Sequence, residues 1–500
     1  MSNIYSRTRN NRPARSAFNL SYEKKMDGDM GLLYPIMCEE VVPGDVIRLG
    51  HEVVTRFQPL VAPVMHEMNI YIHDFFVPYR ILSDDWEEFI SGGPNGDSSA
   101  TLPLWNPTNN AIGSLWDYLG FPTGVVPTGA LPLDFPRRAY NMVYNDYYRD
   151  QTLQSEVALT NESILRRSWE KDYFTSALPF QQRGIAPALP ISGIVSAEFN
   201  NIDFLNKTNY SWSSDTNKMV YTHTTYATKV NPLSGVTVDK AKLEDNSVDL
   251  SNATTFDVSD LRLAFQIQRW MERNARAGVR YTEFLQIHYG VSPRDERLDR
   301  PEYIGGTKAP VIISEVLQTS STDATTPQGN LAGHGISASG NMAGTYRVQE
   351  FGLIIGILSV MPRSAYQQGI NRQWLRRSKY DFYFPEFAHL SEQPIEQAEI
   401  YATAVESENK TVFGYQGRYN EMRSKSNMVC GNMRDTLDYW HLGRQFSSPP
   451  LLNESFILCN PDKRIFAVPS EPGLIMNIGN IITALRPMPA MAEPGFIDHN

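Results

Sequence analysis

Residues Pro59–Gly93, PLVAPVMHEMNIYIHDFFVPYRILSDDWEEFISGG, change within a few positions from the pattern of a β-strand to that of a capped helix. Met68, Ile70 and Ile72 alternate with Asn69, Tyr71 and His73, the period of two that is typical of a strand with one buried face. The run Phe75–Val77 is apolar at every position, which predicts that the end of the strand is covered on both faces. The chain therefore contains at least one strand of a buried sheet.

The second half of this stretch predicts a short helix. Pro78 should end the strand because proline has no N–H to donate. Ser83 is a favourable N-cap, Asp84–Asp85 suit the positive end of the helix dipole, and Gly92 suits the C-terminal turn. The apolar residues within Trp86–Ile90 form one stripe. Helix-terminal electrostatics and a solvated face account for the four carboxylates at 84–88, so we predict no catalytic acid/base pair here.

The composition is that of a folded globular chain. The 500 residues are 41% hydrophobic and 20% charged, and the net charge is −10. No apolar run approaches the ~18 residues that a membrane-spanning helix needs, so we predict no membrane insertion. The N-terminus is polar and arginine-rich, without the apolar segment of a signal peptide.

The residues that usually carry chemistry form no recognisable site. The three cysteines are odd in number and widely spaced, which fits neither a disulfide framework nor a zinc site and indicates synthesis in a reducing cytoplasm. The nine histidines lack paired ligand spacing, and no phosphate-binding glycine loop is present. We therefore predict no catalytic residues, no metal and no cofactor.

The first 25 residues form a basic arm on an otherwise acidic chain. Six cations stand against the single acid Glu23, namely Arg7, Arg9, Arg12, Arg15, Lys24 and Lys25. A flexible basic terminus of this kind is typical of an arm that meets a polyanion, so these six residues are the predicted DNA-binding set. A disordered tail kept soluble by arginine is the alternative.

Several further strands and helices are predicted along the rest of the chain. The expected strands are a pair within Val41–Phe57 with turns at Pro43-Gly44 and Gly50, and then Pro310–Leu317, Phe351–Met361, Val412–Tyr415, Phe456–Leu458, Ile465–Val468 and Gly473–Leu485. The expected helices start near Asp134, near Asp257 or Ser259, and at TEFLQIHY before Gly290. Tyr140, Tyr144 and Tyr147 predict a packed helix face rather than a base-stacking platform.

The remaining segments predict excursions and arms. Residues 94–136 are rich in Gly, Pro, Asn and Thr and predict a long surface excursion. Residues 200–256 are crowded with Asn, Thr, Ser and Asp and predict an exposed insertion. Residues 318–345 predict a mobile loop, and the proline-rich end 486–500 predicts an extended C-terminal arm. The fold class is therefore mainly β, a single eight-stranded jelly roll over residues 26–500 with long, partly helical insertions between its strands.

A basic and aromatic cluster lies at Asn371–Tyr380. It contains Arg372, Trp374, Arg376, Arg377 and Lys379. Interleaved cations and rings could hold single-stranded DNA by phosphate pairing and base stacking. Ion pairing between subunits is the alternative that we favour, because Arg is also preferred at protein interfaces.

The chain resembles the major capsid proteins of gokushoviruses, a group of the Microviridae. The resemblance covers nearly the whole chain except about 94–130 and 200–256. Its matching blocks are Met30–Pro43 (MGLLYPIMCEEVVP), Pro59–Gly93, Asp172–Gly184 (DYFTSALPFQQRG), Asp260–Gly306, Tyr366–His389, Val412–Tyr419, Val468–Pro472 and Arg486–His499. One departure is SALPFQQ, with Phe180 and Gln181, where the family usually has a segment like SALPWPQ.

The resemblance implies a virion protein that assembles into a small icosahedral T=1 shell around a circular single-stranded DNA genome. It implies identical subunits, internal scaffolding proteins, DNA pilot proteins and a bacterial surface receptor as partners. Residues 200–256 would form the protrusion at the three-fold axes and contact the host. A β-rich polysaccharide-active or carbohydrate-binding protein is the alternative; an enzyme of that class needs two carboxylates about 5–10 Å apart.

Overall fold

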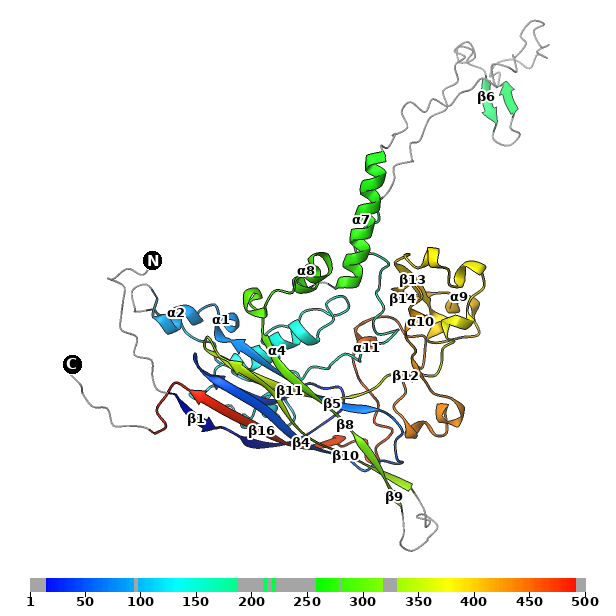
Figure 1. Ribbon diagram of the computed structural model, residues 1–500. Helices are drawn as coiled ribbons and strands as arrows, with labels where there is room; N and C mark the ends of the chain where they lie inside the picture. Colours follow the sequence, from blue (N-terminus) through cyan, green and yellow to red (C-terminus); the bar gives the residue numbers. More distant parts are fainter. Residues whose placement is uncertain are drawn as a thin grey trace, which may run out of the picture. The chain divides into compact units, whose positions relative to one another are not determined.

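The computed structural model describes residues 15–93, 98–187, 210–213, 218–221, 258–278, 280–317 and 331–491. The chain divides into two compact units, the larger formed by residues 1–183 with 272–500 and the smaller by residues 184–271. The fold of the larger unit is mainly β, and its two main sheets are antiparallel (Figure 1). Among the described residues, no helix is long and apolar enough to cross a membrane.

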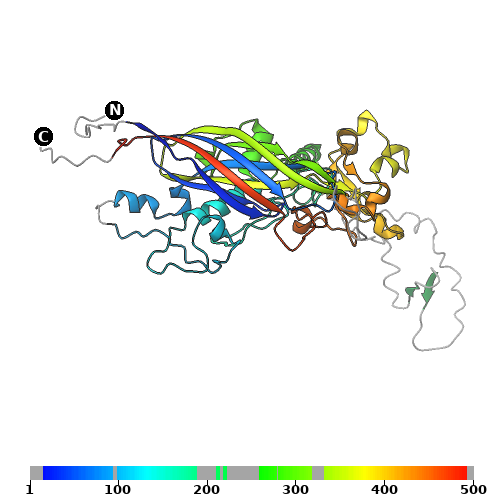
Figure 2. The same ribbon diagram turned by 90° about the horizontal axis from the view of Figure 1, so that it is seen from below.

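The first sheet has six strands and is built around β16. Its members are β1 (Ser16–Asn19), β2 (Tyr22–Gly28), β4 (Val46–Phe57), β9 (Ile312–Leu317), β10 (Leu331–Arg347) and β16 (Leu474–Arg486). The strand order is β1-β16-β4-β10-β9. Strand β2 lies outside this order and, like β1, pairs with β16. The first and last described strands of the chain therefore lie side by side (Figure 2).

The second sheet has four strands in the order β3-β11-β5-β8. They are β3 (Tyr34–Val41), β5 (Met68–Pro78), β8 (Glu302–Pro310) and β11 (Gly352–Pro362). Every residue of β11 is buried, and every residue of β5 except His73 is buried. The alternation at Met68–Ile72 predicted one buried face, and this prediction is wrong because the sheet has an apolar layer on each side.

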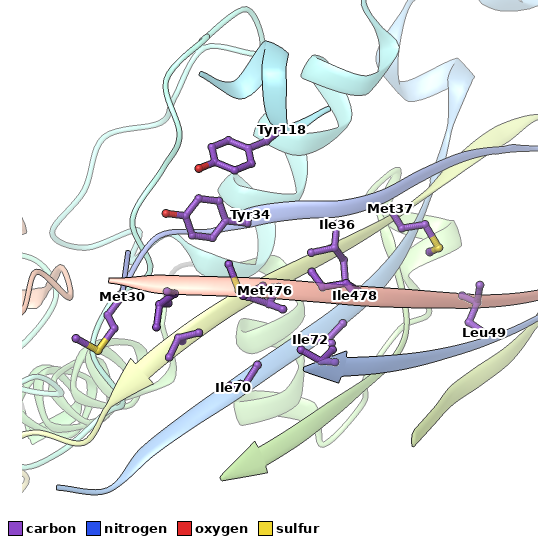
Figure 3. Close-up of a cluster of buried hydrophobic side chains, with 14 of the residues drawn as sticks. Met30, Tyr34, Ile36, Met37, Leu49, Ile70, Ile72, Tyr118, Met476 and Ile478 are labelled. Carbon is purple, nitrogen blue, oxygen red and sulfur yellow. The ribbon is translucent and has the colours of Figure 1, made fainter. Parts of the chain in front are cut away.

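The main core fills the space between the two sheets. Ile36 and Ile70 of the second sheet meet Leu49 and Ile478 of the first, and none of these side chains is more than 2% exposed (Figure 3). Their burial removes branched aliphatic surface from water, at about 25 cal/mol per Å². This layer holds the two sheets together.

A second apolar layer covers the other face of the second sheet. Phe75 of β5 and Ile355 of β11 belong to one buried cluster with Trp105, Trp116 and Tyr140. The helices that contribute to this layer are α1 (Tyr79–Leu82), α3 (Leu115–Tyr118), α4 (Phe135–Val143) and the π-helical turn η2 (Tyr144–Tyr148). Residues 94–136, expected on the surface, thus place two fully buried tryptophans against the sheet.

All described helices lie in two connections between strands. The first, from β5 to β8, contains α1, α2 (Trp86–Ser91), α3, α4, η2, α7 (Val258–Ala277), α8 (Tyr281–Tyr289) and η3 (Asp295–Leu298), with the hairpin β6 (Tyr210–Ser213) and β7 (Lys218–Tyr221). The second, from β11 to β16, contains β12 (Ala365–Tyr366), η4 (Arg372–Trp374), η5 (Lys379–Asp381), η6 (Pro385–Phe387), β13 (Glu392–Glu396), η7 (Gln397–Glu399), α9 (Glu406–Asn409), β14 (Val412–Gly417), α10 (Asn420–Arg423), β15 (Asn427–Met428), η8 (Gly431–Arg434), η9 (Asp438–Trp440) and α11 (Glu454–Ile457). A third apolar cluster, around Ile395, Ile400 and Phe413, packs this second connection.

Several predicted elements are confirmed. The helix at Asp134 begins there, and Tyr140 and Tyr144 are buried on its packed face. Gly92 and Gly290 end α2 and α8 with φ of 75° and 68°, a conformation that glycine adopts without strain. Strands are also found where the sequence predicted them at 310–317, 351–361, 412–415 and 473–485.

The helix predicted after Ser83 is only partly right. Ser83 ends α1 instead of starting a helix, and α2 begins after Asp85, whose side chain makes no capping hydrogen bond. Of the predicted apolar stripe, Trp86 packs against the covering layer, whereas Phe89 and Ile90 are 45% and 50% exposed.

Three other local predictions are wrong. Gly50 lies inside β4, where it pairs with Met342 and Ile481, and makes no turn. Residues 456–458 belong to α11 and the position after it, because the Asn453 carboxamide accepts the Phe456 N–H at 3.0 Å and starts a helical turn. Residues 465–468 make an isolated bridge to Leu60 instead of a strand.

The segment 318–345 was expected to be mobile, and this is wrong for residues 331–345, which belong to the long strand β10. Its glycines fit positions of close approach. A Cβ on Gly333 would lie 2.4 Å from the Ala62 carbonyl oxygen, and one on Gly335 would lie 2.9 Å from the Phe57 ring. These glycines weaken the strand pattern in the sequence, but the close packing around them leaves no room for a side chain.

Candidate functional site

The predicted basic arm is a strand over much of its length. Residues 16–19 and 22–28 form β1 and β2, which pair with β16. Arg15, just before β1, is exposed. Arg7, Arg9 and Arg12 lie outside the described residues.

Lys24 does not face solvent as an arm residue would. Its ammonium donates to the Pro35 carbonyl oxygen at 2.9 Å and to that of Tyr118, and burial lowers its pKa to about 8. Lys25, the next residue on the strand, points the other way and pairs with Glu23 at 3.1 Å while remaining exposed. The predicted flexible segment 1–25 is therefore corrected for residues 16–25, and Lys24 has a structural role.

The basic cluster at 371–380 is divided between paired and exposed cations. Arg372 pairs with Glu399 at 2.6 Å, and Arg376 pairs with Glu421 at 3.2 Å. Burial raises the pKa of Glu399 although the Arg372 guanidinium opposes the shift. Both arginines thus link η4 and the residues after it to η7 and α10 of the same connection, and they are not free to bind a phosphate.

The other members of the cluster face solvent. Trp374 is 69% exposed, and the Arg377 guanidinium donates to the Trp374 carbonyl oxygen at 3.4 Å. The Lys379 ammonium lies 5.0 Å from the centre of the Tyr380 ring. Among the described residues, no carboxylate forms an ion pair with Arg377 or Lys379. These residues remain available for a partner.

A buried polar network connects the two sheets through His51 of β4. Its Nε2 lies 3.0 Å from both carboxylate oxygens of Asp74 on β5, and its Nδ1 lies 3.0 Å from the Asn480 side-chain oxygen on β16. The Asn480 amide nitrogen donates to the Ile36 carbonyl oxygen at 3.0 Å, so its oxygen is the atom left to accept. Both ring nitrogens therefore face acceptors, and only the imidazolium donates to both.

The pKa of His51 agrees with that geometry. Burial on its own would lower this pKa, but the hydrogen bond and the charge of Asp74 outweigh burial and raise it. The side chains of His51 and Asp74 are both fully buried. A Cβ on Gly356 would lie 2.8 Å from the Asp74 carboxylate, so that glycine makes room for the network.

A cavity of about 530 Å³ lies against the outer face of the second sheet, lined by residues that include His73, Tyr148, Arg167, Trp169 and Tyr303. The Arg167 guanidinium lies 4.5 Å from the centre of the Tyr71 ring and donates to the Ser359 hydroxyl at 2.9 Å. Burial, with a smaller effect of Arg167, lowers the pKa of His73 to about 4, so its Nδ1 can accept the Tyr148 hydroxyl at 2.8 Å. The lining is mainly aromatic, and its charged side chains are Arg167, Glu170 and Lys171.

Comparison with known proteins gives one consistent result. The family model described as "Capsid protein (F protein)" matches residues 6–496. The chain is 34% identical to Capsid protein VP1 of Chlamydia phage 1, 33% identical to that of Bdellovibrio phage phiMH2K and 30% identical to that of Spiroplasma virus 4. The alignments cover 96–98% of this chain and 95–97% of those proteins.

The chain belongs to the capsid protein (F protein) family.

Membership in this capsid protein family indicates a structural role in the virion of a phage of the Microviridae, as a subunit of a multi-subunit shell. The geometry is compatible with that role. The described residues contain no group of three or more His, Cys, Asp or Glu side chains that could hold a metal ion, and Cys38, Cys430 and Cys459 are free thiols. The polar groups that are well organised, such as His51 with Asp74, connect elements of the fold.

Two features of this capsid subunit were not predicted from the sequence. The network of His51, Asp74 and Asn480 joins residues that are 23 and 429 positions apart. An aspartate directly before the apolar run Phe75–Val77 was the available signal, because a buried carboxylate requires a partner. The cavity had no comparable signal, since its lining comes from the strands, η2 and residues 167–171.

Proposed function

We propose that this protein is the major capsid protein of a gokushovirus and that its two sheets form an eight-stranded jelly roll. The strand order supports this architecture. Four strands of the first sheet run β2-β16-β4-β10, and the second sheet runs β3-β11-β5-β8. Along the chain, β2 to β5 alternate between the sheets, β8 stays beside β5, and β10, β11 and β16 alternate again, which is the winding of two Greek keys.

Copies of this subunit assemble into a T=1 icosahedral shell that encloses a circular single-stranded DNA genome. The rigid double sheet supplies the wall, and the connections from β5 to β8 and from β11 to β16 supply the contacts between neighbours. In a closed symmetric shell, many interfaces of modest size together make a stable assembly. The subunit is made in the host cytoplasm and meets internal scaffolding and DNA pilot proteins during assembly. The predicted C-terminal arm, 486–500, starts at the last residue of β16, and its residues 492–500 lie outside the described residues. We propose that this arm contacts a neighbouring subunit.

Negative-stain electron microscopy of the purified protein tests this function. We expect closed shells of one small diameter, because identical subunits in a T=1 arrangement give a single size. Dispersed monomers under all assembly conditions would refute the proposal. Monomers that also bind or degrade a polysaccharide would support the carbohydrate-active alternative instead.

We propose that the basic arm contacts the genome through Arg7, Arg9, Arg12 and Arg15, with Lys25 as an additional contact. Replacing the four arginines with Ala should lower genome retention, and each lost phosphate contact should remove about 0.7 from the slope of log K against log salt concentration. Filter binding of single-stranded DNA over a salt series measures this slope. The matched control replaces the same four arginines with Lys, which keeps the charge and should keep the slope. An unchanged slope in the Ala variant would contradict the proposal.

We propose that residues 200–256 form a surface protrusion that contacts the host receptor. Apart from β6 and β7, this insertion lies outside the described residues. A variant with the loop shortened should still form shells of normal diameter but should infect poorly, because the double sheet does not depend on it. Plaque counts per particle, beside micrographs of the same preparation, measure both effects. Failure to form shells would assign the insertion to the assembly interface.

A further inference from the structure

Residues 374–384 present a row of exposed aromatic side chains, which we call the aromatic ledge. Its exposed rings are Trp374 (69%), Tyr380 (56%), Phe382 (52%), Tyr383 (52%) and Phe384 (42%). Single exposed apolar residues are common on proteins, but five exposed rings within eleven residues mark a surface that another molecule covers. Trp and Tyr are also the residues that most often dominate the energy of a protein interface.

The ledge carries an excess of positive charge. Arg377 and Lys379 are exposed and have no ion-pair partner among the described residues, as noted above. The carboxylate of Asp381 accepts the backbone N–H groups of Arg377 and Ser378, which holds it within the turn. Arg423 at the end of the adjacent α10 is exposed as well. Glu386 is an exposed acid next to the ledge, so the three cations Arg377, Lys379 and Arg423 face the two acids Asp381 and Glu386.

The opposite character is found on α2 and the two residues before it, which we call the acidic helix. Its exposed acids are Asp84, Asp85, Glu87 and Glu88. The exposed Phe89 and Ile90 lie beside them, and no Lys or Arg occurs between residues 81 and 93. Arg80, which precedes this segment, is already paired with Asp299 and Glu350. The acidic helix therefore offers both negative charge and apolar surface.

We infer that the aromatic ledge of one subunit receives the acidic helix of a second copy of this chain. The inference rests on the proposed function, since a shell requires contacts between copies. The acidic helix fits the ledge because the charges of the two surfaces are complementary. In this contact Glu87 and Glu88 meet Arg377 and Lys379. Phe89 and Ile90 cover the aromatic rings.

The placement of the two surfaces suits a ring of subunits. Within the larger unit, α2 lies at one end and α10, which bonds to the ledge through Arg376 and Glu421, lies at the other end in both views (Figures 1 and 2). Two different surfaces at opposite ends give a head-to-tail contact, and such contacts form a ring when the rotation between neighbours closes.

Charge reversal tests this contact. Glu87→Lys with Glu88→Lys, or Arg377→Glu with Lys379→Glu, should each lower the yield of shells about tenfold, because each pair becomes repulsive. All four substitutions in one chain should restore the yield, since the charges are again complementary. The control Glu406→Lys with Glu408→Lys changes the exposed helix α9 by the same charge and should assemble normally. Circular dichroism melting should show that every variant is folded.

Carbodiimide cross-linking of wild-type shells gives a second measurement. It should join the Lys379 amine to Glu87 or Glu88 of another subunit, and unassembled protein should lack this peptide. Normal assembly of both reversed pairs, or failure of the four-fold variant to recover, would overturn the inference. Normal shells that lose DNA in the Arg377→Glu, Lys379→Glu variant would assign the ledge to the genome. Absence of shells from the wild type would count against the proposed function and not against this contact.

Discussion

His51→Leu should lower the free energy of unfolding of the subunit by about 3–5 kcal/mol, because it leaves the Asp74 carboxylate buried and unpaired. The substitution keeps an apolar side chain of similar volume at a site that is 2% exposed, so lost packing contributes little. The described contacts of the Asp74 side chain are the two 3.0 Å contacts with His51 Nε2. Urea unfolding of unassembled subunits measures the loss.

A double variant distinguishes the free-energy cost of the unpaired, buried Asp74 carboxylate from the cost of lost packing. His51→Leu with Asp74→Ala should recover part of the stability that His51→Leu loses, because no buried carboxylate then remains. Asp74→Asn should be milder than His51→Leu, since a neutral imidazole can accept an N–H from the new amide. A double variant less stable than the sum of both single changes would show that the charge is not the cause.

The pH dependence of this pair follows from the raised pKa of His51. Because its folded-state pKa lies above the ordinary value of 6.5, the stabilisation by the imidazolium is fully present below that pH. It is lost as pH rises through the folded-state pKa. The stability difference between wild type and the double variant should therefore shrink on going from mildly acidic to alkaline pH, and a constant difference would contradict an ionised pair.

Trp116→Ala should destabilise the subunit by about 3–5 kcal/mol, since it opens a large cavity in the covering layer. The Trp116 side chain is fully buried, packs edge-on against Trp105 with ring centres 4.9 Å apart, and donates its indole N–H to the Pro122 carbonyl oxygen at 2.7 Å. The loss would show that residues 94–136 are part of the folded core and not a dispensable loop.

Trp374→Ala is the matched control, because the same side chain is removed from an exposed position. It should change subunit stability by no more than about 0.5 kcal/mol. Thermal melting of both variants provides the comparison. A small effect of Trp116→Ala would mean that the second sheet tolerates the loss of its covering layer.

Elements with strong local signals were readable in the sequence. The apolar run of β11 predicts a buried strand because it offers no polar face to solvent at all. The helix after Asp134 was readable because proline fits its first turn, and the ends of α2 and α8 were readable because glycine accepts a positive φ there. These features depend on a few neighbouring residues.

The sequence was a poor guide to residues whose structure depends on contacts with distant parts of the chain. β10 contains several glycines and looks like a loop, yet Gly333 and Gly335 are small because Ala62 and Phe57 approach them closely. Lys24 looks like part of a flexible basic arm, yet the alternation of β2 turns it toward the carbonyl oxygens of Pro35 and Tyr118. For Arg372 and Arg376 we favoured ion pairing between subunits over DNA binding, whereas their partners Glu399 and Glu421 lie in the same chain.

The stretch Pro59–Gly93 shows the same division. Its sequence determined that a strand ends at Pro78 and that a helical segment closes at Gly92, because proline and glycine act on the backbone locally. Only the tertiary structure decided that the first half of β5, residues 68–72, is also covered on both faces, that Asp74 meets His51 across the sheets, and that Phe89 and Ile90 stay exposed. Burial and pairing depend on which distant segment packs against a residue, and the local sequence carries no record of that partner.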